Sequence, residues 1–468
     1  MAGFIQDKIY PRLPLYAQNL VISIFGYLWK KRRFGGVFNT ELLNFKDREK
    51  NSRQQWRNYQ TKELRKILNN AFLNVPFYKK KYTKAGFSLV DFENFELSDL
   101  TKLPYLEKDE LRLFGRSTLL STKLEKEGAF YSSSGSTGTP THIRISTRMH
   151  QTWTAGFEAR IRNWAGVTNK TPRGTIGGRR VVADGNSSGP FYRYNTIEKQ
   201  VYFSAYHISD KTIENYVEGM YKHKIEYMTG YAMSNYFLAR FIEEKGLKAP
   251  QLKAVITSSE KLTPEMRATF KRVYGCKSYD SYSGVEDCGM ITECEYGKLH
   301  ISPDLGILEV MKENGEYAKP GETGELICTG ILNYDQPLIR YRIGDLVKVS
   351  IDQNCLCGRH MPIIDEIIGR VEDTVIGPDG REIVRFHGIF IEIPEIIEGQ
   401  IIQHKLEDFE IKIVISHKLK ESSIDLIKKR MKTQLGEVNV KITDVKHIPR
   451  NQNGKFKSVI SYVNREKK

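Results

Sequence analysis

Pro337-Leu-Ile-Arg-Tyr-Arg-Ile-Gly-Asp345 is the stretch that says most about the fold of this 468-residue chain. It reads as a basic, aromatic strand that ends on an aspartate. A carboxylate in that position can accept hydrogen bonds from two vicinal hydroxyl groups, and the ribose of a nucleotide offers such a pair. Alone the segment is a weak signal, so other motifs decide whether Asp345 binds a nucleotide.

Two polar segments lie on either side of this strand in the sequence. Ser281-Tyr-Ser-Gly-Val-Glu286 follows a predicted helix over residues 264–274. Glu286 is either a surface residue or a ligand that holds Mg²⁺ against a phosphate oxygen, because hard cations take carboxylate oxygens. Near the C-terminus, Pro449-Arg-Asn-Gln-Asn-Gly-Lys455-Phe-Lys is either a polar loop that presents Lys455 or a frayed tail.

A third segment, Tyr131-Ser-Ser-Ser-Gly-Ser-Thr-Gly-Thr-Pro140, contains only Ser, Thr and Gly between Ser132 and Thr139. Such a run lets backbone N–H groups converge on one point and adds hydroxyl donors, which suits an oligophosphate. It lacks the Gly-Lys-Ser/Thr that closes a Walker loop. A flexible linker has a similar composition, so the segment alone leaves both interpretations open.

The order and spacing of these segments resemble the adenylate-forming ligase superfamily, and within it the phenylacetate–coenzyme A ligase-like branch often encoded among capsular polysaccharide genes. The resemblance covers nearly the whole chain. The family's phosphate loop, Ser-Ser-Gly-Thr-Thr-Gly-Lys-Pro, is matched by residues 133–140, with Thr139 in place of the lysine. The family's Tyr-Gly-x-x-Glu appears as residues 282–286, with Ser283 as a departure, and Arg342-Ile-Gly-Asp345 matches the end of Arg-Tyr-Arg-Thr-Gly-Asp.

The resemblance implies a fold and a division into domains. The fold class is α/β, with a large N-terminal adenylate-forming domain of mixed β-sheets and helices and a small, mobile α+β C-terminal domain. Alternating strand and helix patterns through about residue 345, and a restart of the pattern after residue 369, agree with this. We expect a basic amphipathic segment at 1–66, the large domain at 67–368 and the small domain at 369–468.

The same resemblance implies the residues of the site. Glu286 and Lys455 are the expected catalytic residues: Glu286 holds Mg²⁺, and Lys455 bridges the carboxylate and the α-phosphate. Glu372 and Asp373 lie in the motif at which the small domain rotates. The residues expected to bind the nucleotide are Ser132, Ser133, Ser134, Gly135, Ser136, Thr137, Gly138, Ser259, Glu260, Tyr282, Asp345 and Arg370.

The activity implied is that of an ATP-dependent, AMP-forming ligase that adenylates a carboxylic acid and passes the acyl group on. The acceptor is an amine, as in surface polysaccharide assembly, or the thiol of coenzyme A. The rival interpretation is a noncatalytic nucleotide-binding scaffold. The presence of Thr139 in place of the family lysine favours it, whereas the presence of Glu286, Asp345 and Lys455 at their motif positions argues against it. Tyr231 and His207 are candidates for the acid pocket, although the pattern around His207 favours a structural histidine.

All six cysteines lie between Cys276 and Cys357, which is unlike a secreted disulfide framework and fits a reducing cytoplasm. Three thiolates and an imidazole, from Cys294, His300, Cys355 and Cys357, are the donor set of a tetrahedral Zn²⁺. Cys288 is an alternative third sulfur, and separate inert thiols are the alternative to a metal. Cys276 and Cys328 stand in apolar surroundings typical of a core.

The net charge of +16 is concentrated near the N-terminus, because residues 1–66 contain fourteen Lys and Arg against five Asp and Glu. No aromatic and basic recognition module accompanies it, so we expect no nucleic-acid partner. Residues 15–29 form an apolar helix with a narrow stripe of polar and small residues, and Lys30-Lys31-Arg32-Arg33 follows at once. This pattern indicates either a helix in the headgroup region of an anionic membrane or one packed on its own protein with a solvated basic run.

No stretch approaches the roughly 18 apolar residues that span a bilayer, and the first residues lack the pattern of a signal peptide. We therefore expect a cytoplasmic protein, with peripheral attachment to the inner face of the membrane as the further expectation.

Overall fold

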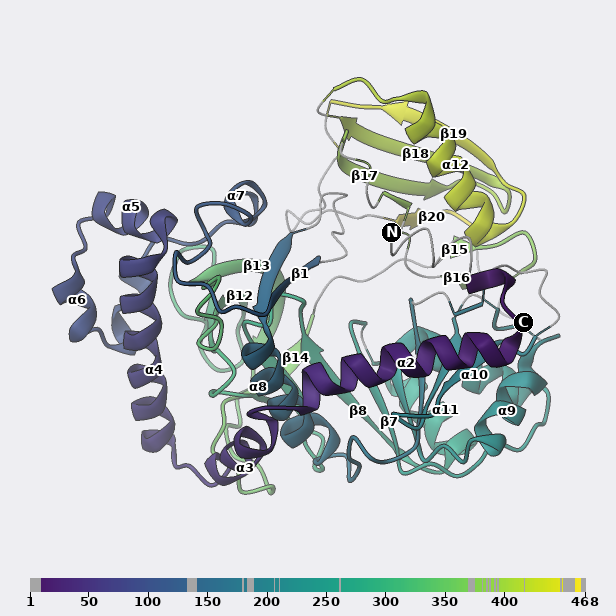
Figure 1. The fold of residues 1–468 in the computed structure, drawn as a ribbon, viewed down its shortest axis with the longest axis horizontal. Coiled ribbons are helices and arrows are strands. Elements are labelled where there is room, and N and C mark those ends of the chain that lie inside the picture. The colour runs from purple at the N-terminus through teal and green to yellow at the C-terminus, as the bar shows by residue number, and fades with distance from the viewer. Residues whose placement is uncertain are drawn as a thin grey trace.

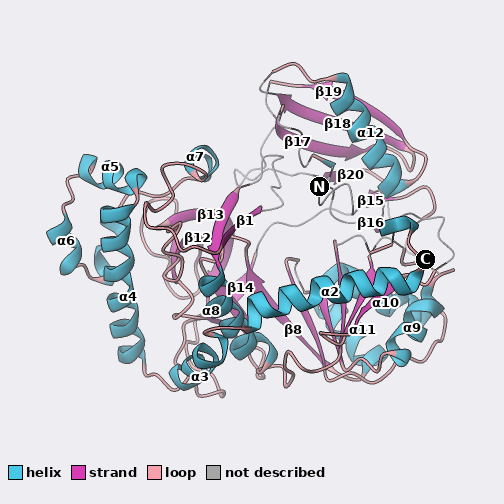
Figure 2. Ribbon diagram, viewed as in Figure 1, coloured by secondary structure: helices cyan, strands magenta, loops and turns pink. Residues whose placement is uncertain are grey.

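The structure is a computed structural model that describes residues 10–463, apart from 133–140, 179–180, 183–188, 206, 210, 261, 369–374, 381, 384–385, 387–388, 391–392, 394, 416, 447 and 449–458. A large α/β body is built on one long mixed sheet, and a smaller α+β unit follows residue 374 (Figure 1, Figure 2). The expected fold class is confirmed.

The long sheet has twelve strands in the order β11-β12-β13-β14-β10-β9-β8-β7-β6-β3-β5-β4. Strands β8, β7, β6, β3 and β5 are parallel neighbours, and the remaining pairs are antiparallel. The strands are β3 (Arg173–Gly177), β4 (Tyr192–Asn195), β5 (Gln200–Ser204), β6 (Tyr227–Tyr231), β7 (Ala254–Ser258), β8 (Lys277–Ser283), β9 (Met290–Glu293), β10 (Leu299–Ile301), β11 (Ile307–Met311), β12 (Thr323–Thr329), β13 (Tyr341–Val349) and β14 (Ile363–Ile367). A separate hairpin pairs β1 (Gly128–Ser132) with β2 (His142–Ser146).

Local sequence explains where the helices begin and end. Helix α11 starts after Thr263, whose hydroxyl accepts from the backbone N–H of Met266, has Pro264 in its first turn, and stops at Gly275 with φ +68°. The other helices of the body are α2 (Leu15–Phe34), α3 (Phe38–Arg48), α4 (Arg53–Asn74), α5 (Pro76–Lys84), α6 (Leu89–Glu93), α7 (Lys108–Phe114), α8 (Thr147–Phe157), α9 (Ile213–Lys222) and α10 (Ala232–Glu244). Short 3₁₀ turns occupy Tyr10–Arg12 and Leu97–Lys102, and a π-helical turn occupies Glu158–Arg162.

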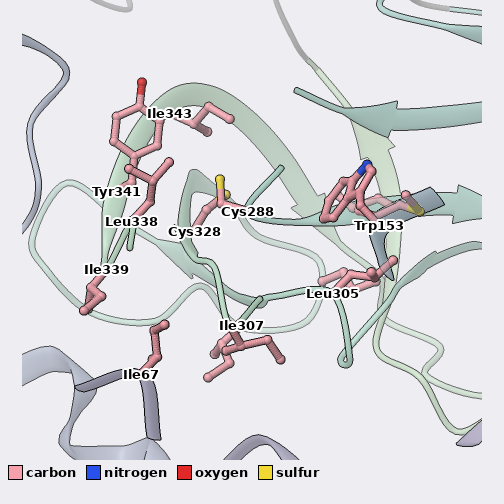
Figure 3. Packing of buried hydrophobic residues seen from close by; sticks show 14 of the residues in the cluster. Ile67, Trp153, Cys288, Leu305, Ile307, Cys328, Leu338, Ile339, Tyr341 and Ile343 are labelled. Carbon is pink, nitrogen blue, oxygen red and sulfur yellow. The ribbon is translucent and has the colours of Figure 1, made fainter. Parts of the chain in front are cut away.

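Two apolar clusters hold the body together. One joins α4 and its neighbours to the antiparallel part of the sheet: Figure 3 shows Ile67 of α4 near Ile307 and Ile339. The other lies between the parallel strands and helices α9, α10 and α11. Helix α4 runs through the boundary expected at residue 66 and buries Leu64 as well as Ile67, so its first half is part of the body rather than of a separate N-terminal segment.

The small unit is a four-stranded sheet covered by one helix. Its order is β19-β18-β17-β20, with α12 (Glu421–Leu435) packed on it. Strand β18 alternates as its sequence predicts, burying Phe409, Ile411 and Ile413. The strands are β17 (Ile396–Gln403), β18 (Asp408–Ile415), β19 (Asn439–Asp444) and β20 (Val459–Ser461), and a short hairpin pairs β15 (Val375–Ile376) with β16 (Glu382–Ile383).

Helix α2 packs on the body through its polar stripe. The Ser23 hydroxyl accepts a hydrogen bond from the backbone N–H of Thr196 at 3.2 Å. A Cβ added at Gly26 would lie 2.2 Å from the side chain of Asn195, so the close approach of helix and loop requires glycine there. The helix therefore packs on its own protein, as one of the two interpretations of its sequence has it.

The apolar residues of α2 point away from the protein, although a surface helix usually buries them. The large apolar side chains of this outer face are Tyr16, Leu20, Val21, Ile24, Phe25, Tyr27 and Leu28, with exposed fractions between 40% and 76%. In the described part of the chain, no helix is both long enough and apolar enough to cross a bilayer.

The basic run at the end of α2 differs from the solvated cluster expected. Arg32 donates to the Tyr131 hydroxyl and to the Ile145 carbonyl oxygen, both at 3.0 Å, and Arg33 forms an ion pair with Glu198. Only Lys30 and Lys31 are exposed. The expectation of four solvated charges is wrong for the two arginines, because the body supplies buried oxygen acceptors at that end of the helix.

Candidate functional site

Residues expected to bind the nucleotide meet at the carboxyl ends of β6, β7 and β8. These strands are parallel neighbours, with Tyr231 opposite Ser258 and Ser258 opposite Ser281, so their carboxyl ends share one edge of the sheet. Tyr231 ends β6, and Ser259 and Glu260 directly follow β7. This edge of a parallel sheet is where α/β proteins bind ligands.

A hydrogen bond joins this edge to β13, the strand that contains Asp345. The Tyr282 hydroxyl on β8 donates to Oδ2 of Asp345 on β13 at 2.7 Å. Three strands separate β8 from β13 in the sheet order, so the sheet curves to bring the two side chains together. Burial, and then the Asp345 carboxylate, raise the pKa of Tyr282 well above its usual value, which keeps the phenol a neutral donor.

Glu286 lies beside Thr141, the first described residue after the Ser/Thr/Gly segment. Its side chain is buried, and the Thr141 hydroxyl donates to its Oε1 at 3.5 Å. Asp287 follows it with φ +47°, and burial together with Glu286 raises the pKa of Asp287 well above its usual value. Two adjacent carboxylates in a buried place favour a cation, so Asp287 joins Glu286 as a candidate that the sequence reasoning missed.

Strands β1 and β2 precede and follow the same segment in the sequence and pair with each other. Ser132, at its start, pairs with His142, and the Ser132 hydroxyl lies 3.0 Å from Nδ1 of His142. Ser133, Ser134, Gly135, Ser136, Thr137 and Gly138, and also Arg370, Glu372, Asp373 and Lys455, lie outside the described residues. Their expected roles remain predictions.

A cavity of about 320 Å³ starts at this edge and extends along the sheet under α2. Gly230 and Tyr231 at the end of β6 line it, as do Trp29 and Arg33 of α2. Arg162 and Arg173 lie at the other end of the lining, and no sequence motif singled out either of these two residues. Among the expected pocket residues, Tyr231 lines the cavity.

His207 lies elsewhere. It is buried, its Nδ1 is 2.6 Å from the Ser204 hydroxyl, and its ring stacks on Phe191 at 5.1 Å between centroids. It is not among the described residues that line the cavity. These contacts match the structural alternative for this histidine.

Cys294, His300, Cys355 and Cys357 come together as one cluster, and their ligand atoms all lie within 4.8 Å of one another. The two sulfurs of Cys294 and Cys355 are 3.6 Å apart, and Cys357 Sγ is 3.4 Å from Nε2 of His300. Zn–S distances of about 2.3 Å in a tetrahedron place two sulfurs about 3.8 Å apart, so the spacing fits Zn²⁺. Burial lowers the pKa of His300 to about 4, which leaves the ring neutral.

Two tight turns and an aromatic shell hold this cluster. Gly297 has φ +80° and donates to the carbonyl oxygen of Cys294 at 2.9 Å, and Gly358 has φ +73° and donates to that of Cys355 at 3.1 Å. The His300 ring meets Trp164 edge to face. Cys288 lies instead next to Cys328 in the apolar core, as Figure 3 shows, and so does not replace Cys294 in the cluster.

Comparison with known proteins adds sequence and structural relatives. Residues 375–462 match the CapK C-terminal domain family. Protein CapK of Staphylococcus aureus is 25% identical over 98% of this chain and 99% of its own length. Phenylacetate–coenzyme A ligase of Escherichia coli strain K12 is 25% identical over 84% of this chain and 92% of its own.

A solved structure of 2-hydroxyisobutyryl-CoA ligase in the postadenylation state matches with a TM-score of 0.57 and 19% identity. It covers 89% of this chain and 91% of its own. At this identity the match establishes the fold alone, and that fold is the one found in adenylate-forming ligases.

Proposed function

We propose, from its homology with CapK and with phenylacetate–coenzyme A ligases, that this chain is an ATP-dependent, AMP-forming ligase. It joins a carboxylic acid to AMP, releases pyrophosphate, and passes the acyl group to an acceptor. The observation that best supports this is the Tyr282–Asp345 hydrogen bond beside the carboxyl ends of β6–β8. It holds a carboxylate for ribose hydroxyls at the edge where a nucleotide would lie.

The first step has an electrostatic problem, because an anionic carboxylate must attack the anionic α-phosphate. In our proposal residues 132–138 hold the phosphates with backbone N–H and hydroxyl groups, and Lys455 lies between the two reacting groups. Arg370 contacts the nucleotide, and Glu372 and Asp373 allow the small domain to rotate after the first step. Mg²⁺, for which Glu286 and Asp287 fit as ligands, supplies further positive charge when bound.

An amine is the acceptor that we propose, in the assembly of a surface polysaccharide. The thiol of coenzyme A is the alternative, and the names of the ligases similar to this chain support it. The test is a panel of carboxylic acids scored for ATP-dependent pyrophosphate release, alone and with coenzyme A or amines. Pyrophosphate release without any acyl transfer to amines excludes the amine, and no release with any acid favours a noncatalytic scaffold.

Zn²⁺ at Cys294, His300, Cys355 and Cys357 is a second proposal, and its role is structural. All four positions are taken by side chains, which is typical of a closed structural site. The cluster joins the β9–β10 hairpin to the segment after β13 and packs against α4 through Trp56. The metal would therefore fasten two segments that are distant in sequence, beside α4.

Attachment to an anionic membrane is the third proposal. The outer face of α2 is apolar along its length, and the helix contains no acidic residue. Lys30 and Lys31 are exposed at one end of this face, and Arg12 precedes the other. A helix that presents apolar and basic side chains outward suits the headgroup region of an anionic bilayer, on the inner face of the membrane.

A further inference from the structure

The cavity under α2 shows which chemical class of acid this site would take, if the proposed function holds. One end lies at Gly230 and Tyr231, beside the strand ends where the reacting carboxylate would meet ATP. The other end lies between Arg33, Arg162 and Arg173. An acid that reacts at the first end therefore extends its remaining groups toward three guanidinium groups.

The lining between these ends mixes apolar side chains, among them Trp29, Ile176 and Phe203, with several hydrogen-bonding ones. Thr175 and Gln200 face it from β3 and β5, joined by a 2.7 Å hydrogen bond from the Gln200 amide to the Thr175 hydroxyl, and Thr229 faces it from β6. Among the described residues that line the cavity, none is a carboxylate. A group in this part of the cavity therefore meets hydrogen-bonding as well as apolar side chains, so the charges at the remote end distinguish one class of acid from another.

The charges around the cavity leave a positive surplus. Within the described ranges, Glu198 forms ion pairs with both Arg33 and Arg173, and Glu158 forms one with Arg162 at 2.8 Å. Two carboxylates thus face three guanidinium groups, whose side chains are at most 16% exposed.

The lowered pKa of Arg33 agrees with this surplus of positive charge. Burial lowers the pKa of Arg33 to about 10; Glu198 opposes the shift, and the charges of Arg162 and Arg173 add to it. Three buried guanidinium groups share two carboxylates, and one further anion would balance the charge of the group.

We propose that the acid activated at this site carries a second anionic group at the end remote from the reacting carboxylate, and that Arg33, Arg162 and Arg173 bind that group. A dicarboxylate is the simplest member of the class. The two guanidinium–carboxylate networks hold the arginines in place, and the second anion of the substrate completes the charge balance.

Binding is measured first, without ATP, so that it does not depend on the proposed reaction. Trp29 lines the cavity, and its fluorescence should change when an acid enters. The probes are short dicarboxylates, each beside its neutral monoamide, together with sugar acids and phenylacetate. Trp29→Phe identifies the signal. We expect each dicarboxylate to bind at least about 10-fold more tightly than its monoamide, because the amide leaves the surplus charge unpaired.

Substitutions test whether Arg33 binds the second anionic group of the acid. Arg33→Gln should remove the preference for dicarboxylate over monoamide, and Arg33→Lys should retain most of it because the charge is kept. Lys31→Gln removes the same charge from the exposed side of the same helix and should change neither affinity. Thermal unfolding of each variant separates loss of binding from loss of fold.

The outcomes separate this inference from the proposed function. Equal affinity for acid and monoamide, or tighter binding of phenylacetate or of singly charged sugar acids, would overturn the inference even if pyrophosphate is released. A dicarboxylate preference that Arg33→Gln abolishes would support it even if ATP is never consumed, and only the proposed function would then fail.

Discussion

The Tyr282 hydroxyl and Oδ2 of Asp345 are 2.7 Å apart although 63 positions separate them in the chain. The bond uses one oxygen of the carboxylate and fixes the plane of the group. An aspartate held in this way can orient a pair of ribose hydroxyls without first losing side-chain freedom, which lowers the entropic cost of binding.

This relationship predicts the effect of Tyr282→Phe. The variant keeps the ring and loses one hydrogen bond to a carboxylate, worth about 1.5–3 kcal/mol, so the KM for ATP should rise by about 10-fold or more. The KM for the acid should stay within about 2-fold, because Tyr282 is not among the described residues that line the cavity. Steady-state kinetics with each substrate varied in turn measure both, and an equal rise in the two constants would contradict this role.

Lys455→Ala should lower adenylate formation by on the order of 10²-fold or more, comparable with the loss of one positioned electrostatic donor. The second step, started from a supplied acyl-adenylate, should survive, because the small domain would have turned the lysine away by then. Both half-reactions are measured separately by product release. Equal loss in the two would reject the division of work between domain orientations.

The cysteine cluster predicts about one zinc per chain in protein purified without metal-affinity steps. Cys355→Ser should release the metal and lower thermal stability, since a structural site contributes directly to folding. Cys276→Ser is the matched control: it removes a buried thiol outside the cluster and should leave the zinc content unchanged. Elemental analysis decides, and fully stable protein without zinc would end the proposal.

The outer face of α2 predicts co-sedimentation with anionic vesicles. Lys30 and Lys31 together contribute roughly 2 kcal/mol near an anionic surface, whereas burying a single leucine contributes about 1.5–3 kcal/mol. Salt should therefore weaken binding without abolishing it, and replacement of Leu20, Ile24 and Leu28 by serine should abolish it.

In the matched control, serine replaces Leu43, Val90 and Leu113, three exposed apolar residues outside α2. This variant should bind the vesicles as the wild type does. Wild-type protein that stays in the supernatant with anionic vesicles at low salt would show that the membrane is not the partner of α2.

Local signals in the sequence were sufficient for many elements. The helix over 264–274 was predictable to the residue because Thr263, Pro264 and Gly275 mark its ends. The metal cluster was predictable because only a few cysteines and one nearby histidine were available, and the structure brings them together. In both cases short-range chemistry restricts the possibilities strongly.

Other features depend on contacts that no local pattern encodes. The periodicity of α2 distinguishes its two faces, but which face packs inward depends on acceptors and donors of the loop around Asn195. The arginines of the cavity come from α2, the π-helical turn and β3, and each one alone resembles an ordinary surface charge in the sequence. Their shared site arises only from the topology of the sheet.

Helix α2 contacts the body at Gly26 and lines the cavity with Trp29 and Arg33, so a ligand on its outer side and a ligand in the cavity would both act on the same helix. Any ligand on the outer side that holds the helix in its seat reduces the freedom of the inner wall, and an acid bound inside reduces the freedom of the outer side. By reciprocity each must change the affinity of the other by the same factor. Under the proposed function, a ligand on the outer face would thus change the affinity for the acid bound inside.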